Sequence, residues 1–271
     1  MHPILFKLGP IDVRSYGFML AVAFLVGILL GGRQAERIGI KPAVIYDLSI
    51  QLMLGAIIGA RLFYVIFHWS DFSDNWLAII NPFQQGKLIG IEGMNMYGGV
   101  IVAMILGITY LYRHHQPVWK IADLLIPYLA LGTAITRIGC FLNGCCFGVP
   151  TKCLTGVCFP ENSLPDSIYP NLHIHPTQLY ESVFSLLLFL FLMYINRIKK
   201  FNGLAFWLWI LCYAIFRFLI EFIRYYEDAM YLIQTPWKIT MNQGIALAAA
   251  LGSIVIILIW NRHVSTGNHQ S

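Results

Sequence analysis

Long apolar runs alternate with short polar or glycine-containing segments along the whole chain. Seven of these runs are long enough to cross a bilayer as helices, because about 20 apolar residues span its hydrocarbon core. They cover approximately residues 16–30, 44–67, 96–112, 121–141, 179–195, 203–223 and 242–260. A polar, cysteine-rich loop, 142–178, separates the fourth run from the fifth. The pattern predicts an all-α integral membrane protein with seven transmembrane helices in one membrane domain, 1–271.

Composition narrows the class of protein further. Hydrophobic residues make up 58% of the 271 residues and charged residues only 11%, whereas soluble proteins carry about 25% charged residues. So little polar surface excludes an ordinary soluble domain. The net charge of +5 comes without a continuous basic run, so we expect membrane anchoring and no nucleic-acid partner. The first run lacks a small-residue cleavage site after it, so we expect a retained helix.

The distribution of lysine and arginine predicts the orientation. Loops that stay in the cytoplasm are enriched in these residues. Nine of them follow the first, third, fifth and seventh runs: Arg33, Arg37, Lys41, Arg113, Lys120, Arg197, Lys199, Lys200 and Arg262. Six others are spread over the longer segments of the opposite side. We therefore expect the N-terminus outside, the C-terminus in the cytoplasm and the cysteine-rich loop outside.

Three further arginines, Arg61, Arg137 and Arg217, lie within apolar runs. A charge in the hydrocarbon region costs from about 2.5 kcal/mol upward, so such residues normally face the protein interior or a wet cavity and are candidates for function. Each of the three falls in the later part of a run that should pass from inside to outside. We expect their side chains to meet near the outer leaflet.

A polar stripe is predicted on the sixth run. Tyr213, Arg217, Glu221 and Arg224 are spaced by four, four and three residues, which keeps side chains on one face of a helix. A guanidinium group binds phosphate through two hydrogen bonds and keeps its charge. The stripe favours a site for a phospholipid headgroup. An internal salt-bridge network, with Glu221 paired to either arginine, is the alternative.

A glycine-rich segment, 136–148, follows the fourth run. Gly139, Gly144 and Gly148 would end the helix and let backbone N–H groups approach a ligand. The segment favours an anion site. A helix cap with a closely packed turn explains the same glycines.

Six segments resemble, in the same order, segments of the bacterial prolipoprotein diacylglyceryl transferases. The resemblance extends over nearly the whole chain. The segments are SYG (15–17), GARLFYVIF (59–67), GMNMYGG (93–99), RIGCFLNGCCFG (137–148), HPTQLYE (175–181) and YAIFRFLIEFIR (213–224).

The resemblance implies a multi-pass enzyme of the bacterial inner membrane. Such a transferase moves the diacylglyceryl group of phosphatidylglycerol to the lipobox cysteine of a prolipoprotein signal peptide and releases glycerol phosphate. It implies no cofactor and no metal. Positive charge on the leaving phosphate suits this reaction.

The resemblance also implies roles for individual residues. Arg137 and Arg217 would hold the phosphate and the leaving group, and Glu221 would orient Arg217 or Arg224. Tyr16 and Tyr213 would donate hydrogen bonds. The remaining residues implied for the site are Tyr97 as a catalytic residue, and Arg61, Gly148, Asn143 and His175 in substrate binding.

Three positions depart from the usual pattern of the family. Cys140 stands at an asparagine, Cys145 at a glutamate and Tyr97 where many members have a histidine. Thiols are weak hydrogen-bonding groups compared with an amide or a carboxylate. A divergent member that uses another acceptor or lipid, and a phospholipid-binding or transport protein without transfer, therefore stay open as alternatives.

Five cysteines, Cys140, Cys145, Cys146, Cys153 and Cys158, crowd into the region that we expect outside, where thiols oxidise. We expect a disulfide that staples this loop. A metal site formed by the last four, and a redox-active pair, are the alternatives.

Two residues of the segment 175–181 each have two possible roles. His175 is expected to position the loop before the fifth run, with proton transfer as the alternative. Glu181 would cap that helix or pair with an arginine.

Overall fold

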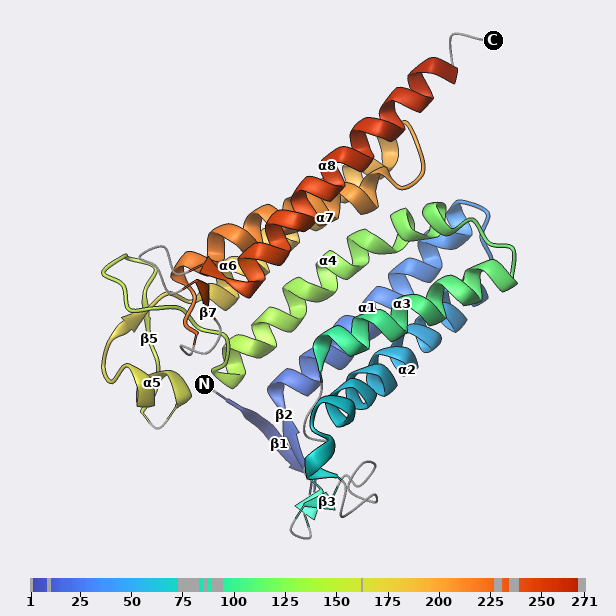
Figure 1. Cartoon of the computed structure of the whole chain (residues 1–271). Coiled ribbons are helices and arrows are strands. Elements are labelled where there is room, and N and C mark those ends of the chain that lie inside the picture. The colour runs from blue at the N-terminus through green and yellow to red at the C-terminus, as the bar shows by residue number, and fades with distance from the viewer. Residues whose placement is uncertain are drawn as a thin grey trace. The chain divides into compact units, whose positions relative to one another are not determined.

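The structure is a computed structural model that describes residues 2–8, 11–72, 83–84, 87–88, 95–161, 163–226, 231–233 and 239–267. Its long helices are α1 (Ser15–Arg37), α2 (Pro42–Phe67), α3 (Met96–Arg113), α4 (Val118–Asn143), α6 (Thr177–Ile198), α7 (Leu204–Ile220) and α8 (Met241–Gly267) (Figure 1). With the turn after α7 included, these seven helices of the described residues are long and apolar enough to cross a membrane. The prediction of seven helices in a multi-pass membrane protein is confirmed.

Short elements accompany the long helices, and the apolar pattern did not predict them. Four two-stranded sheets are present among the described residues, and the last three are antiparallel. They are β1 (Ile4–Leu8) with β2 (Ile11–Arg14), β3 (Phe83–Gln84) with β4 (Lys87–Leu88), β5 (Val157–Cys158) with β6 (His173–Ile174), and β7 (Tyr231–Ile233) with β8 (Ile239–Thr240). The described residues also form short helices at η1 (Trp69–Asp71), α5 (Leu164–Ile168) and η3 (Glu221–Ile223).

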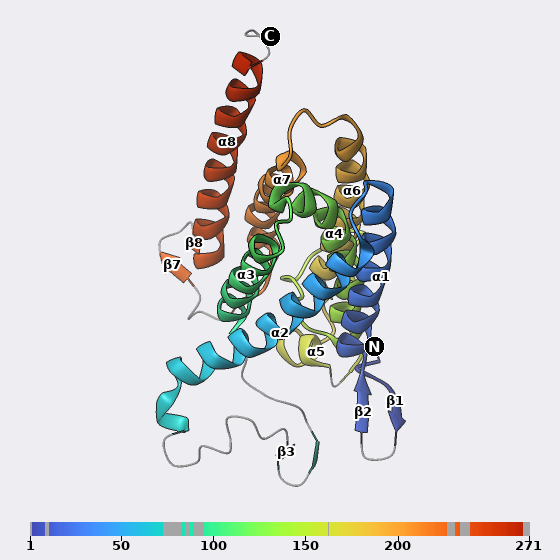
Figure 2. The ribbon, with the colours of Figure 1, turned by 90° about the vertical axis from the view of Figure 1, so that its right-hand side faces the viewer.

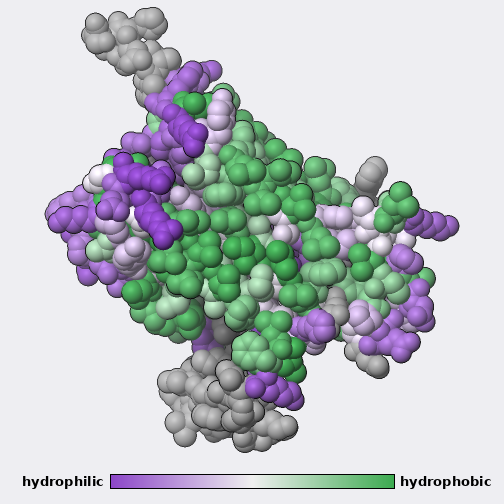
Figure 3. All heavy atoms as spheres, turned by 180° about the vertical axis from the view of Figure 1, so that it is seen from behind, coloured by the Kyte–Doolittle hydropathy of each residue, from purple (hydrophilic) through white to green (hydrophobic). Residues whose placement is uncertain are grey.

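Large apolar side chains are exposed along the helices. Leu25 is 58% exposed, Ile105 58% and Leu187 60%, and many others exceed a third. On the face drawn in Figure 3, hydrophobic side chains cover the middle and hydrophilic ones gather toward the margins. Water would oppose such exposure, whereas lipid tails solvate it. The surface agrees with an integral membrane protein.

The chain divides into two compact units. The first comprises Met1–Leu5, Arg14–Gly27 and Ala122–Ser271, and the second comprises Phe6–Val13 and Ile28–Ile121. The single membrane domain expected from the sequence stays a prediction.

Within the second unit, α2 packs against α3 through glycines. A Cβ atom on Gly98 would lie 2.6 Å from the carbonyl oxygen of Gly59, so neither helix tolerates a larger residue at the contact. Asn95 caps α3 by accepting a hydrogen bond from Gly98 N at 3.2 Å. Small residues allow this close approach of two helix backbones in a membrane.

Within the first unit, α4 and α6 lie side by side (Figure 2). Ile126 and Ala130 of α4 pack with Leu188 and Leu192 of α6 and with Ala205 of α7. Next in the chain, α8 runs along α7 (Figure 1). These contacts hold α4, α6 and α7 as a rigid frame for polar side chains between them.

One end of this frame is tied by Asp123, which is fully buried. Its carboxylate accepts hydrogen bonds from Lys199 Nζ at 2.6 Å, Gly203 N at 2.7 Å and Phe206 N at 3.0 Å. The two backbone donors belong to the start of α7, whose first N–H groups have no partner inside the helix. Asp123 of α4 therefore caps α7 and pairs with the end of α6.

The cysteine-rich loop is folded without a disulfide. All six cysteines are free thiols, so the expected staple is wrong. Backbone hydrogen bonds hold the loop, such as Thr151 N to His173 O at 2.8 Å, and β5 pairs with β6. Phe147, Phe159 and Ile174 form a small buried core within the loop. Aromatic packing and strand pairing replace the predicted covalent link.

Candidate active site

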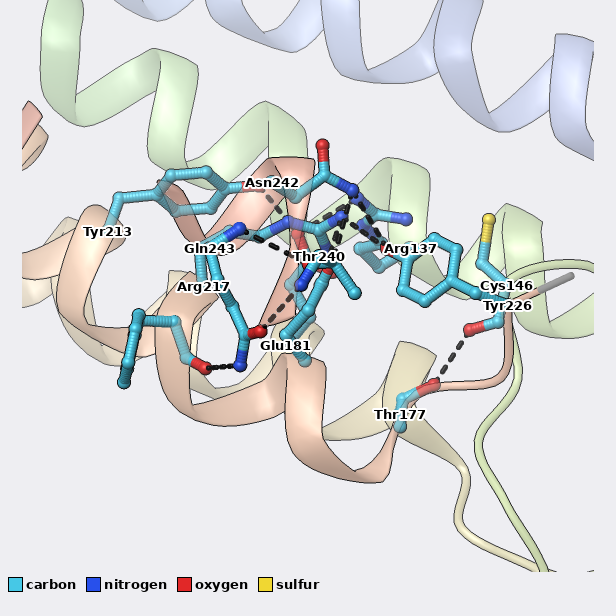
Figure 4. Close-up of polar contacts among 12 residues, drawn as sticks. Arg137, Cys146, Thr177, Glu181, Tyr213, Arg217, Tyr226, Thr240, Asn242 and Gln243 are labelled. Atoms are coloured by element: carbon cyan, nitrogen blue, oxygen red, sulfur yellow. Dashed lines mark hydrogen bonds and ion pairs between the residues drawn. The ribbon is translucent and has the colours of Figure 1, made fainter. Parts of the chain in front are cut away.

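Arg137 and Glu181 form an ion pair at the end of the α4–α6 contact. Arg137 Nη2 lies 2.9 Å from Glu181 Oε1, and the Glu181 side chain is 2% exposed. The Tyr213 hydroxyl donates a hydrogen bond to the same oxygen at 2.7 Å (Figure 4). Of the two readings of Glu181, pairing with an arginine is confirmed. The carboxylate joins α4, α6 and α7.

A second ion pair follows one turn along α7. Arg217 Nη2 lies 3.5 Å from Glu221 Oε2, and the Glu221 side chain is fully buried. The other oxygen of Glu221 accepts hydrogen bonds from Thr240 Oγ1 at 3.1 Å and Asn242 Nδ2 at 2.9 Å. Arg217 Nη2 also donates to the Tyr226 hydroxyl at 2.8 Å (Figure 4). The expected contact between Glu221 and Arg217 is confirmed.

Two guanidinium donors of this cluster have no hydrogen-bond partner among the described residues. They are Arg217 Nη1 and Arg224 Nε, and both are buried. Arg137, Arg217 and Arg224 carry three positive charges, whereas Glu181 and Glu221 carry two negative ones. A buried cationic donor without an acceptor is costly, and an anion would satisfy it.

The polar stripe on α7 is shorter than predicted. Tyr213 and Arg217 lie on the α-helix, and Glu221 opens the single turn η3. Arg224 has extended backbone angles and forms an isolated β-bridge with Gly148. The prediction that Arg224 continues the helical face is therefore wrong. Backbone pairing with the turn after α4 fixes the position of Arg224. Its guanidinium group lies over the Tyr226 ring at 5.5 Å.

Gly148 is required by close packing. A Cβ atom there would meet Ile223 O and would lie 2.7 Å from His175 Cβ. Gly148 N donates to His175 O at 3.0 Å, and His175 N donates to Val149 O at 3.1 Å. Of the two expectations for the glycines, the packed turn explains this one. His175 holds that turn through its backbone, in agreement with its expected positioning of the loop.

Asn143 lies within the segment that resembles the family signature, and Tyr16 lies against that segment. Tyr16 lies in the first turn of α1, where its Cα would be 3.2 Å from a Cβ atom on Gly139. Asn143 is the last residue of α4. The signature segment therefore packs against the start of α1.

Arg61 and Tyr97 belong to the second unit. The Arg61 guanidinium lies over the Phe72 ring at 5.1 Å and the Tyr64 ring at 5.7 Å. Tyr97 lies in the first turn of α3 and is 47% exposed. The expected meeting of Arg61 with Arg137 and Arg217, and the role of Tyr97, stay predictions.

Two groups beside the cluster have shifted pKa values. Burial raises the pKa of Tyr226, against the lowering effect of Arg224 and Arg217. Hydrogen bonds with Cys140 and Cys145, followed by the charges of Arg224 and Arg137, lower the pKa of the Cys146 thiol.

Sequence reasoning missed several partners of the Arg217–Glu221 pair: Tyr226 accepts from Arg217, and Thr240 and Asn242 donate to Glu221. Tyr226, Thr240 and Asn242 are distant from Arg217 in the chain or lie beyond the end of the helix. Asn242 was expected only as the first residue of the last span. The polar sequence Thr240 to Gln243, at the start of an apolar run, was the available signal.

These features define a multi-pass membrane protein with a buried arginine cluster suited to a phosphate group. A family model described as prolipoprotein diacylglyceryl transferase matches residues 3–259. A phosphatidylglycerol–prolipoprotein diacylglyceryl transferase of Clostridium tetani is 34% identical over 224 residues, which cover 83% of this chain and 86% of the relative. A protein of the same name from Bacillus cereus is 32% identical over 255 residues, covering 93% and 90%.

A third relative of that name, from a Nostoc species, is 36% identical over 230 residues, which cover 82% of this chain and 78% of the relative. The range of the family model, residues 3–259, includes every segment that carried the resemblance. The chain belongs to the prolipoprotein diacylglyceryl transferase family.

Proposed function

We propose that this protein transfers the diacylglyceryl group of phosphatidylglycerol to the lipobox cysteine of prolipoproteins. The names of its relatives support this activity. We further propose a location in the bacterial inner membrane, with the N-terminus outside and the C-terminus in the cytoplasm, as the distribution of lysine and arginine favours.

The proposed step is a displacement at a glycerol carbon. The sulfur of the acceptor cysteine gives up its proton to water and forms a bond to that carbon, and the bond from the carbon to the phosphate oxygen breaks. The electron pair of the broken bond leaves with glycerol phosphate, which gains negative charge. Positive groups that face the phosphate stabilise this developing charge more than they stabilise the substrate.

The observation that carries the proposal is the pair of unsatisfied guanidinium donors. Arg217 Nη1 and Arg224 Nε are buried and lack a hydrogen-bond acceptor among the described residues. Phosphate oxygens fit such donors in geometry and charge. We assign Arg217, Arg224 and Arg137 to phosphate binding. They would bind the phosphate of the lipid headgroup first and that of the leaving glycerol phosphate afterwards.

Glu181, Glu221 and Tyr213 position these arginines. Glu181 holds Arg137 at 2.9 Å, and Tyr213 donates to Glu181 at 2.7 Å. Glu221 is held in turn by Thr240 and holds Arg217 at 3.5 Å. A guanidinium group that is already oriented loses less conformational entropy when the phosphate arrives.

The other predicted site residues stay in the proposal through their resemblance to the family. Tyr16, Asn143 and Gly148 would shape the phosphate site from the signature segment and the start of α1. Tyr97 would act in catalysis and Arg61 in lipid binding. His175 would keep the turn at Gly148 in place, which its backbone hydrogen bonds support.

The test is mass spectrometry of a lipobox peptide incubated with the purified protein in vesicles that contain phosphatidylglycerol. We expect a diacylglyceryl mass gain on the peptide cysteine. Arg137→Ala and Arg217→Ala should each lower the rate by roughly 10²–10³-fold, as the removal of one group that stabilises transition-state charge does. Arg197→Ala is the matched control, because Arg197 is exposed at the end of α6.

No mass gain with folded protein would overturn the proposal. Retention of full activity in both arginine variants would overturn the assignment of the site. Thermal unfolding in the same detergent shows whether each variant is folded.

A divergent activity is the second candidate, and the thiols at Cys140 and Cys145 favour it. These residues stand where the family signature has an asparagine and a glutamate. In that case the protein would bind phosphatidylglycerol vesicles and leave the lipobox peptide unmodified. Other thiol acceptors and other phospholipids, supplied in the same assay, would then separate altered specificity from binding without transfer.

A further inference from the structure

Three thiols converge at the end of α4. The sulfur atoms of Cys140, Cys145 and Cys146 all lie within 4.8 Å of one another. Cys140 is buried in the last turn of α4, and the other two are half-buried in the turn that follows. In the described part of the chain, this group contains sulfur ligands only.

The backbone folds back to bring the thiols together. Gly144 has a φ of 77° and Cys146 a φ of 65°, both in the left-handed region. Cys145 N donates to Cys140 O at 3.2 Å, which closes the turn. A non-glycine residue in this region is strained, and such strain concentrates at functional positions. This turn places the Cys146 sulfur beside the other two thiols.

Positively charged groups lie beside two of the three cysteines. Arg137 Nη1 donates to Cys140 Sγ at 4.0 Å, and Arg224 and Arg137 interact electrostatically with Cys146. The thiolate is the form that binds metals. The same charges would offset the negative charge that three thiolates keep around one metal ion.

The spacing of the sulfur atoms suits a shared ion. Sulfur ligands lie about 2.3 Å from a bound zinc ion, so three around one ion of that size are about 4 Å apart. The observed limit of 4.8 Å is within reach of that value by small side-chain rotations. A disulfide would use two of the three thiols and leave the third without a role.

We propose that Cys140, Cys145 and Cys146 bind one thiophilic metal ion, and specifically Cu(I). Soft thiolate ligands suit Cu(I), zinc and iron–sulfur clusters, but structural zinc and the clusters are typically held by four protein ligands, so three thiolates favour Cu(I). The described residues supply no fourth histidine, cysteine or carboxylate to this group. The proposal goes beyond the transferase activity and does not depend on it.

The test titrates Cu(I) into the full chain, reduced and purified in detergent under anaerobic conditions, against a chromogenic Cu(I) chelator. We expect one Cu(I) per chain, and a sulfur-only first shell by X-ray absorption. The triple variant Cys140→Ser, Cys145→Ser, Cys146→Ser should bind at least 100-fold more weakly. The control Cys153→Ser, Cys158→Ser removes two exposed thiols of the same loop and should bind as the parent does.

Equal Cu(I) binding by the parent and the triple variant would overturn the proposal. Full binding by any one of the three single serine variants would overturn the three-ligand site. Stoichiometric uptake of Zn(II) in a parallel titration, with no Cu(I) uptake, would overturn the choice of metal. Thermal unfolding of each variant in the same detergent shows that it is folded, so loss of binding reports on the thiols.

Discussion

Two buried carboxylate clusters connect the helices of the first unit, and they differ in how their partners are satisfied. Asp123 accepts from one lysine and two backbone N–H groups, all at 3.0 Å or less. Around Glu181 and Glu221, the two carboxylates face three arginines, and Arg217 Nη1 and Arg224 Nε keep no acceptor among the described residues.

The Asp123 cluster is explained by a structural role, whereas the arginine cluster supports the proposed phosphate site. A closed set of hydrogen bonds and one balanced ion pair explain Asp123 without a ligand. Under the proposed function, an anion would satisfy the unpaired cationic donors beside the ion pairs. Both clusters are buried, so burial does not distinguish them. They differ in whether every hydrogen-bond donor has an acceptor and in whether the charges balance.

The largest expected effect is the loss of stability when the Asp123 cluster is broken. Asp123→Ala leaves Lys199 and the start of α7 without their acceptor, and breaking a buried ion pair by removing one partner costs about 3–5 kcal/mol. Thermal unfolding in detergent should show a strong loss of stability. Adding Lys199→Met should recover part of it, and Lys200→Met, at an exposed neighbour, should not. An unchanged unfolding temperature of Asp123→Ala would contradict the structural role of this cluster.

The second expected effect concerns Glu181 in the arginine cluster. Glu181→Gln removes the charge that orients Arg137, and a hydrogen bond to a charged group contributes about 1.5–3 kcal/mol. Transfer to the lipobox peptide should slow by roughly 10- to 100-fold in kcat, while KM for phosphatidylglycerol changes little. Glu36→Gln, at an exposed glutamate, is the control. A change in KM alone would show that Glu181 acts on binding and not on the transition state.

A smaller effect is expected at Tyr213. Tyr213→Phe removes the hydroxyl that donates to Glu181 at 2.7 Å and leaves the ring stacked on Trp209. Loss of this one hydrogen bond should slow transfer by roughly tenfold, with the unfolding temperature nearly unchanged. If both activity and stability fell strongly, the hydroxyl would be structural, as Asp123 is.

The smallest effect is a pH dependence at Tyr226. Burial raises the pKa of its hydroxyl above the ordinary value, so the folded state holds the proton more tightly than the unfolded state. The resulting stabilisation is present below the ordinary pKa of tyrosine, about 10, and is lost as the pH rises through the folded pKa. The unfolding temperature should therefore fall less steeply above about pH 10 in Tyr226→Phe than in the parent. Parallel curves for the two proteins would contradict this assignment.

Local patterns predicted the elements better than the contacts between them. The seven helices follow from uninterrupted apolar runs, because each run carries its own signal for burial in lipid. The helical spacing of Tyr213, Arg217 and Glu221 predicted a shared face, and the pair of Arg217 with Glu221 is confirmed. The same spacing failed at Arg224, because the helix ends before it and a β-bridge to Gly148 sets its place.

The sequence by itself determined that this chain is a multi-pass membrane protein of a known transferase family, with arginines inside apolar helices. Only the tertiary structure decided that Glu181 pairs with Arg137, that Asp123 caps α7, and that three thiols meet while remaining free. Hydrophobic periodicity is a property of one segment, so it can be read along the chain. Hydrogen-bond partners from different helices depend on how those helices pack, which no single segment encodes.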